Sequence, residues 1–117
     1  MDAEISPERV EELCASADPP RIVDIRNPTA FQRGHIPGSH NIPFDQLPAK
    51  IETLEDADHI VTVCPHGQAS VQAARLINSY TGTESARVES MHGGLTEWDG
   101  AFDSETVGAE EGPDSPF

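Results

Sequence analysis

One stretch near the middle of the chain, residues 59–80, constrains the possible folds most strongly. Its first part, His59–Val63, is an apolar and β-branched run of the kind found in buried strands. Its last part, from Val71 to Tyr80, spaces apolar residues as an amphipathic helix does. Only the loop CPHGQAS separates the two parts. The stretch therefore predicts a buried strand that turns tightly into a helix.

The loop places a cysteine where chemistry is favoured. Cys64 directly follows the predicted strand, and ligands of open α/β sheets bind at the carboxyl ends of strands. Backbone N–H groups that enter a helix can converge on an anion such as a thiolate, whose pKa falls there. The alternative is an inert cysteine that packs as a small hydrophobe. Gly67 and the immediate helix start favour the reactive cysteine.

The rest of the chain alternates between strand and helix signals. Ser6 followed by Pro7 predicts a helix start, because serine caps helices and proline suits the first helical position. Apolar runs and the turn residues between them predict strands at residues 2–5, 21–25, 41–42 and 86–91, and helices at residues 7–17, 27–33, 45–54 and 95–99. This alternation predicts an α/β domain with a mainly parallel sheet.

The length of 117 residues allows one domain with one core, which we expect to span residues 1–103. From Ser104 onward the sequence is acidic, with glycine, proline and little apolar material. Residues 104–117 are therefore predicted to form an acidic, disordered tail. No apolar run reaches membrane-spanning length, and the start lacks a basic segment followed by an apolar core. We expect a cytoplasmic protein without a membrane partner.

The chain contains 21 acidic residues against 7 lysines and arginines, for a net charge of -14. This charge argues against binding to nucleic-acid phosphates. It fits either an acidic surface that binds a partner or a surface suited to concentrated salt, where the Debye length falls to about 3 Å at 1 M. Lys50 is the sole lysine and the acids are spread along the chain, which favours the second interpretation and predicts a halophilic source organism.

Neither a disulfide nor a metal site is expected. The two cysteines are far apart in the sequence, and the five histidines lack ligand spacing. Cys14 falls on the apolar stripe of the helix predicted at residues 7–17, which favours a core position over catalysis.

Three motifs, in order, resemble those of the rhodanese-like family. VDIRNPTAFQRGHIPGSHNIP, residues 23–43, is similar to the family's Asp-x-Arg, short helix and Gly-His-Ile-Pro-Gly segment. The strand ending in Cys64, with Gly67 three residues later, resembles its active-site loop. GGLTEW, residues 93–98, resembles its Gly-Gly-x-x-x-Trp motif. The resemblance covers about residues 4–103 and implies a mainly parallel sheet of about five strands with helices on both faces.

The resemblance also implies a sulfurtransferase without a cofactor. Cys64 would take a sulfane sulfur from a donor such as thiosulfate, hold it as a persulfide, and pass it to a thiol, to cyanide or to a protein acceptor. The substrate-binding loop would consist of Pro65, His66, Gly67, Gln68, Ala69 and Ser70. We expect Asp24 and Arg26 to fix the end of a strand, and His35 to hydrogen-bond a neighbouring loop.

The loop departs from the family's common Cys-x-x-Gly-x-Arg-Ser pattern, because Ala69 occupies the position of the arginine. The loss of this cation is expected to weaken the capture of thiosulfate and to raise the pKa of Cys64. Pro65 has no N–H and so removes one possible donor from the loop. His66 either restores a positive charge when it is protonated or is an exposed residue without a role in binding. Phosphatases of this architecture carry an arginine six residues after the cysteine, where this chain has Ser70, so phosphatase activity is not expected.

Two other functions remain open from the sequence. One is a non-catalytic rhodanese-like module that binds or regulates a partner through its acidic surface. The retained cysteine argues against this module, and the missing loop arginine argues for it. The other is a redox sensor in which Cys64 is oxidised to sulfenic acid or pairs with a small thiol.

The charge generates a prediction about stability. Self-repulsion among the excess acids is screened as ionic strength rises, so the folded state is expected to gain stability in salt. Thermal melting in dilute buffer and in molar KCl measures this effect. A melting temperature that stays constant or falls with salt would contradict the halophilic interpretation and favour the acidic binding surface.

Overall fold

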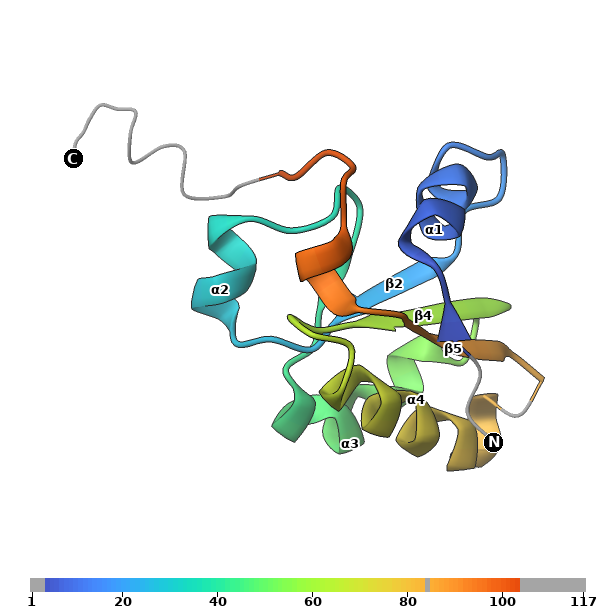
Figure 1. Ribbon diagram of the computed structural model, residues 1–117. Helices are drawn as coiled ribbons and strands as arrows, with labels where there is room; N and C mark the ends of the chain where they lie inside the picture. The colour runs from blue at the N-terminus through green and yellow to red at the C-terminus, as the bar shows by residue number, and fades with distance from the viewer. Residues whose placement is uncertain (1–3, 84, 104–117) are drawn as a thin grey trace.

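The structure, a computed structural model, describes residues 4–83 and 85–103 (Figure 1). The predicted tail at 104–117 and the start of the first predicted strand lie outside the described residues. Five parallel strands form one sheet in the order β1-β5-β4-β2-β3. The predicted parallel sheet is thus confirmed. The strands are β1 (Glu4–Ile5), β2 (Arg21–Asp24), β3 (His40–Asn41), β4 (His59–Val63) and β5 (Arg87–Met91).

Helices cover both faces of the sheet, as predicted (Figure 1). On one face, α1 (Pro7–Cys14) and the 3₁₀ segment η4 (Gly94–Glu97) lie over a cluster that includes Val61 and Val63. On the other face, α3 (Leu47–Lys50) and α4 (Ala69–Ser79) lie over a cluster that includes Ile60. Successive residues of β4 point to opposite faces, and both faces are covered, which explains why Ile60, Val61 and Val63 are all apolar and buried.

The predicted helix at residues 7–17 is too long. It starts as expected, with Ser6 Oγ accepting from the N–H of Arg9, but it ends at Cys14. The hydroxyl of Ser16 donates to the carbonyl of Leu13 at 2.6 Å, and this local bond replaces a further helical turn. Cys14 is half-buried at the edge of the core rather than inside it.

The segment predicted as one helix at residues 45–54 is divided into three. A 3₁₀ turn (Phe44–Gln46) precedes α3, and a second 3₁₀ turn (Ile51–Leu54) follows it. Pro48 lies near the start of α3. Because proline has no N–H, it cannot donate the hydrogen bond that would join α3 to an α-helical turn before it. The helix predicted at residues 95–99 is likewise the 3₁₀ segment η4. The short helix at residues 27–33 is confirmed as α2 (Pro28–Arg33), with Asn27 as its cap.

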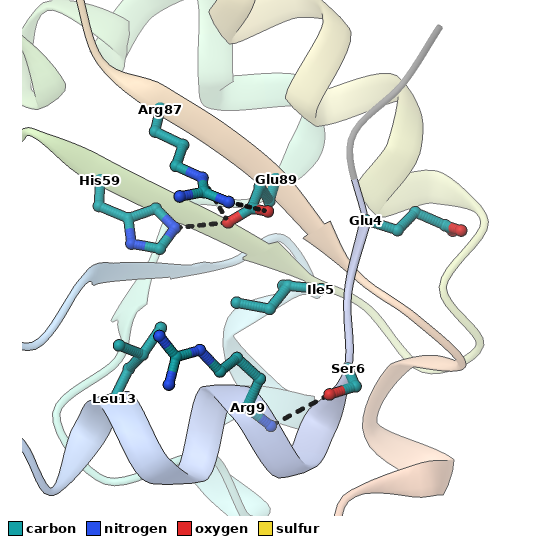
Figure 2. Close-up of a pocket in the computed structure, with 8 residues that line it drawn as sticks. All are labelled: Glu4, Ile5, Ser6, Arg9, Leu13, His59, Arg87 and Glu89. Atoms are coloured by element: carbon teal, nitrogen blue, oxygen red, sulfur yellow. Dashed lines mark hydrogen bonds and ion pairs between the residues drawn. The ribbon is translucent and has the colours of Figure 1, made fainter.

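One charged cluster, around the buried carboxylate of Glu89, lies beside α1 toward the amino ends of β4 and β5 (Figure 2). The side chain of Glu89 is 7% exposed, and its Oε1 lies 2.6 Å from His59 Nε2 and 3.4 Å from Arg87 Nε. Figure 2 shows His59 and Arg87 converging on this carboxylate. Together with Arg9 of α1 they line a hollow of about 350 Å³. Because His59 and Arg87 begin their strands, this hollow lies at the opposite end of β4 from Cys64.

Among the described residues, no helix has both the length and the apolar character needed to cross a bilayer.

Candidate active site

The end of β4 delivers Cys64 into the loop that leads to α4. The residue is 2% exposed, so its sulfur lies below the surface. The N–H groups of Gly67 and Ser70 donate to Sγ at 3.1 and 3.3 Å, and the N–H of His66 also faces the sulfur. Ser70 Oγ is 3.3 Å from Sγ. The loop therefore encloses one sulfur atom with several donors, which suits a thiolate.

These contacts decide the ionisation of Cys64. Burial by itself raises the pKa of the Cys64 thiol. The hydroxyl and N–H of Ser70, together with the N–H groups of Gly67 and His66, lower it, and the pKa lies below its ordinary value. Cys14 behaves in the opposite way, because burial and the nearby charge of Glu11 raise the pKa of its thiol. The two cysteines of the chain are thus distinguished by their surroundings.

Two buried hydroxyl groups, on β4 and β5, hold Ser70 in place from the side of the sheet. Thr62 Oγ1 donates to the carbonyl of Ser70 at 2.7 Å, and Ser90 Oγ lies 2.7 Å from Ser70 Oγ. Thr62 and Ser90 are fully buried and are paired across β4 and β5. The sequence prediction missed both residues. The available signal was a small polar residue next to buried apolar residues, Thr62 between Val61 and Val63 and Ser90 before Met91.

The Gly93–Gly94 turn closes against the cysteine loop. Gly93 and Gly94 have φ values of 72° and 67°, which favour glycine. A Cβ on Gly94 would lie 2.4 Å from the carbonyl oxygen of Cys64 and 2.5 Å from the nitrogen of Gly67. The N–H of Leu95 donates to that same carbonyl at 2.8 Å. The glycines therefore permit two backbones to touch, which places the third sequence motif against the second.

Asp24 and Arg26 form an ion pair at the carboxyl end of β2. The Asp24 carboxylate is fully buried and accepts from Arg26 through Nε at 3.0 Å and Nη2 at 2.7 Å. Arg26 Nη2 also donates to the carbonyl of Gly34. The side chain of Asn41 donates to the carbonyls of Asp24 and Arg26, so the strand end is held from two sides.

His35 lies where α2 meets the last described segment. Its Nδ1 is 2.7 Å from the carbonyl of Phe31, and its ring stacks on Phe31 at 3.8 Å. Its backbone exchanges two hydrogen bonds with Asp103. This placement ties the end of α2 to residues 101–103.

Four of the predicted loop residues face outward. Pro65, His66, Gln68 and Ala69 are exposed, whereas Ser70 is buried. Gln68 and Ala69 join two residues that the sequence prediction missed, Phe44 and Gln72, around a hollow of about 400 Å³. Among the described residues, no three histidine, cysteine or acidic side chains come together as metal ligands.

A comparison with protein families matches residues 6–101 to the model described as "Rhodanese-like domain". The chain belongs to the rhodanese-like family. Thiosulfate sulfurtransferase GlpE of Ectopseudomonas mendocina is 34% identical over 108 residues, covering 92% of this chain and 94% of the relative. GlpE of Pseudoalteromonas translucida is 38% identical over 81 residues, covering 69% and 74%.

The fold agrees with solved members of the rhodanese-like family. The crystal structure of a rhodanese-like domain protein from Staphylococcus aureus matches with a TM-score of 0.75 at 20% identity, covering 87% of this chain and 97% of that protein. The likeness extends over nearly the whole of that domain.

The loop geometry predicts that Cys64 ionises at lower pH than Cys14. Titration of thiolate ultraviolet absorbance in Cys14→Ser and Cys64→Ser variants measures each thiol alone. Ser70→Ala removes one donor to the thiolate and is expected to raise the pKa of Cys64, because the thiolate loses a stabilising hydrogen bond. If Cys64 titrates at or above the pH of Cys14, the described cradle does not act on the sulfur.

Proposed function

We propose that this rhodanese-like domain is a sulfurtransferase that carries sulfur on Cys64. The observation that supports the proposal most directly is the set of N–H donors around Cys64 Sγ, which lowers the pKa of a buried thiol. The relatives named thiosulfate sulfurtransferases support thiosulfate as a donor. We place the reaction in the cytoplasm, where a reducing environment keeps cysteines as thiols.

The first half of the reaction loads sulfur onto the enzyme. The Cys64 thiolate attacks the outer sulfur of thiosulfate, a new S–S bond forms, and sulfite leaves with the electron pair of the broken S–S bond. No oxidant is required, because the sulfane sulfur is transferred at its existing oxidation level. The N–H groups of Gly67, Ser70 and His66 would stabilise the thiolate before attack and the anionic persulfide sulfur afterwards, as an oxyanion hole does.

The second half returns the enzyme to its thiolate. A thiol or cyanide attacks the terminal persulfide sulfur, bonds to it, and displaces Cys64 as a thiolate. The same donors that lower the pKa of Cys64 make it a good leaving group. Asp24 and Arg26 act by holding the strand end beside the loop. The exposed Gln68 and Ala69 would border the path of incoming substrates.

Intact-mass spectrometry after incubation with thiosulfate tests the proposal. The expected product is the protein plus one sulfur atom, lost again when cyanide is added. Cys64→Ser is expected to abolish the adduct, and Cys14→Ser, the matched control, is expected to retain it. If neither thiosulfate nor an organic persulfide gives an adduct, the non-catalytic binding module is favoured. An adduct that forms only with peroxide would favour the redox sensor.

A second variant examines the missing loop cation. Ala69→Arg is expected to place a guanidinium over the hollow next to Gln68, where it can meet the sulfonate of thiosulfate with two hydrogen bonds. Position 69 is exposed, so we expect a gain of about 1 kcal/mol, which is about a fivefold lower KM with a smaller change in kcat. Ala69→Gln, of similar length but neutral, is the control. Equal KM values for both variants would show that charge at this position does not limit donor binding.

A further inference from the structure

A second hollow, of about 500 Å³, is lined by residues of α2, of η4 and of the last described segment. Leu95 links it to the site, because its N–H donates to the carbonyl of Cys64. Figure 1 shows α2 and η4 facing each other beside the loop that follows β4. The hollow is lined by Arg26, Ala30, Arg33, Gly34, Leu95 and Phe102.

This hollow contains an arginine without an ion-pair partner among the described residues, Arg33. Four other arginines are paired with acids: Arg9 with Glu12, Arg21 with Asp56, Arg26 with Asp24 and Arg87 with Glu89. Acidic residues outnumber lysines and arginines threefold in this chain, so a guanidinium that faces a hollow without an acid is unusual here. Its charge is available to a carboxylate of a ligand.

The lining at Phe102 is apolar and fixed in place. Phe102 is 49% exposed and, with Phe44, is one of two large hydrophobic residues exposed in the described part of the chain. The two backbone hydrogen bonds between His35 and Asp103, at 2.9 and 2.8 Å, hold the segment of Phe102 against the end of α2. A Cβ on Gly34 would lie 3.9 Å from the Phe102 ring, so the ring already packs beside this glycine. The hollow is therefore formed before any ligand enters.

We propose that this hollow binds the acceptor of the transferred sulfur and selects a low-molecular-mass organic thiol that carries a carboxylate. Arg33 pairs with the carboxylate, while Ala30, Leu95 and Phe102 contact the carbon skeleton. Thiosulfate and cyanide lack a carbon chain that could contact these apolar side chains. The hollow therefore suits an organic substrate. The inference depends on the proposed sulfurtransferase function for its reaction step.

In that step the acceptor thiolate attacks the terminal sulfur of the Cys64 persulfide. A bond forms between the two sulfurs, the bond to Cys64 Sγ breaks, and its electron pair stays on Cys64 as a thiolate. The product is the persulfide of the acceptor. No external oxidant or reductant enters the balance.

Two matched tripeptides test the proposal, acetyl-Cys-Gly-Asp-amide and its neutral analogue acetyl-Cys-Gly-Asn-amide. The ratio of their rates with the loaded Cys64 persulfide, measured at low ionic strength, is the readout. Arg33→Gln is expected to lower the Asp/Asn ratio about two- to fivefold, the range of one exposed ion pair. Phe102→Ser is expected to slow both peptides without changing the ratio.

Lys50→Gln is the control for net charge, because it also removes one cation but lies outside the hollow, on α3. It is expected to leave the ratio unchanged. If Lys50→Gln and Arg33→Gln change the ratio equally, the effect comes from overall charge and the proposal is overturned. It is also overturned if neither variant changes the ratio.

A binding measurement separates this proposal from the proposed function. S-methylated forms of the same tripeptides cannot accept sulfur, so calorimetric titration reports binding alone. Tighter binding of the Asp peptide that disappears in Arg33→Gln supports the hollow even if no persulfide ever forms on Cys64. Normal persulfide loading, with no dependence on Arg33 in either measurement, would retain the sulfurtransferase and discard the hollow as an acceptor site.

Discussion

A buried sulfur atom whose hydrogen-bond donors favour the thiolate is the constraint on which this site depends. Burial of Cys64 raises its pKa and favours the neutral thiol, and the Ser70 hydroxyl and three backbone N–H groups of the loop oppose this effect. The positive potential at the sulfur therefore comes from the shape of the loop, with no lysine or arginine within residues 64–70. This explains how a chain with so few cations can lower the pKa of its cysteine.

The shape of the loop depends in turn on residues far away in the sequence. Thr62 and Ser90 hold Ser70 from the sheet, while Gly94 allows its own backbone to touch that of Cys64 and Gly67. The ion pair of Asp24 and Arg26 fixes the neighbouring strand end. Thr62 and Ser90 have short, fully buried side chains, and Gly94 acts through its backbone, so the donors around the sulfur are held in position before substrate arrives.

Local patterns in the sequence predicted the parts of this structure that local forces decide. The bounds of β4 and the start of α4 near the cysteine follow from apolar runs and helix spacing. The support from Ser90 could not be predicted in this way, because it depends on the register of β4 against β5. Phe102 and Arg33 line one hollow only because a backbone pairing brings residues 101–103 to the end of α2.

The order of strands in the sheet has a consequence for folding. β4 pairs with β5, and β5 pairs with β1, so the earliest described strand has no partner until residues 87–91 are available. Parallel pairings across such long sequence separations form slowly, because their loop-closure entropy is lost before the contacts are gained. The carbonyl of Cys64 likewise gains its hydrogen bond from the N–H of Leu95 only after that later residue has been synthesised. During synthesis on the ribosome, the strand, cysteine and helix therefore exist for some time without the glycine turn that closes the loop, and a finished sulfur cradle is among the last features that the chain acquires.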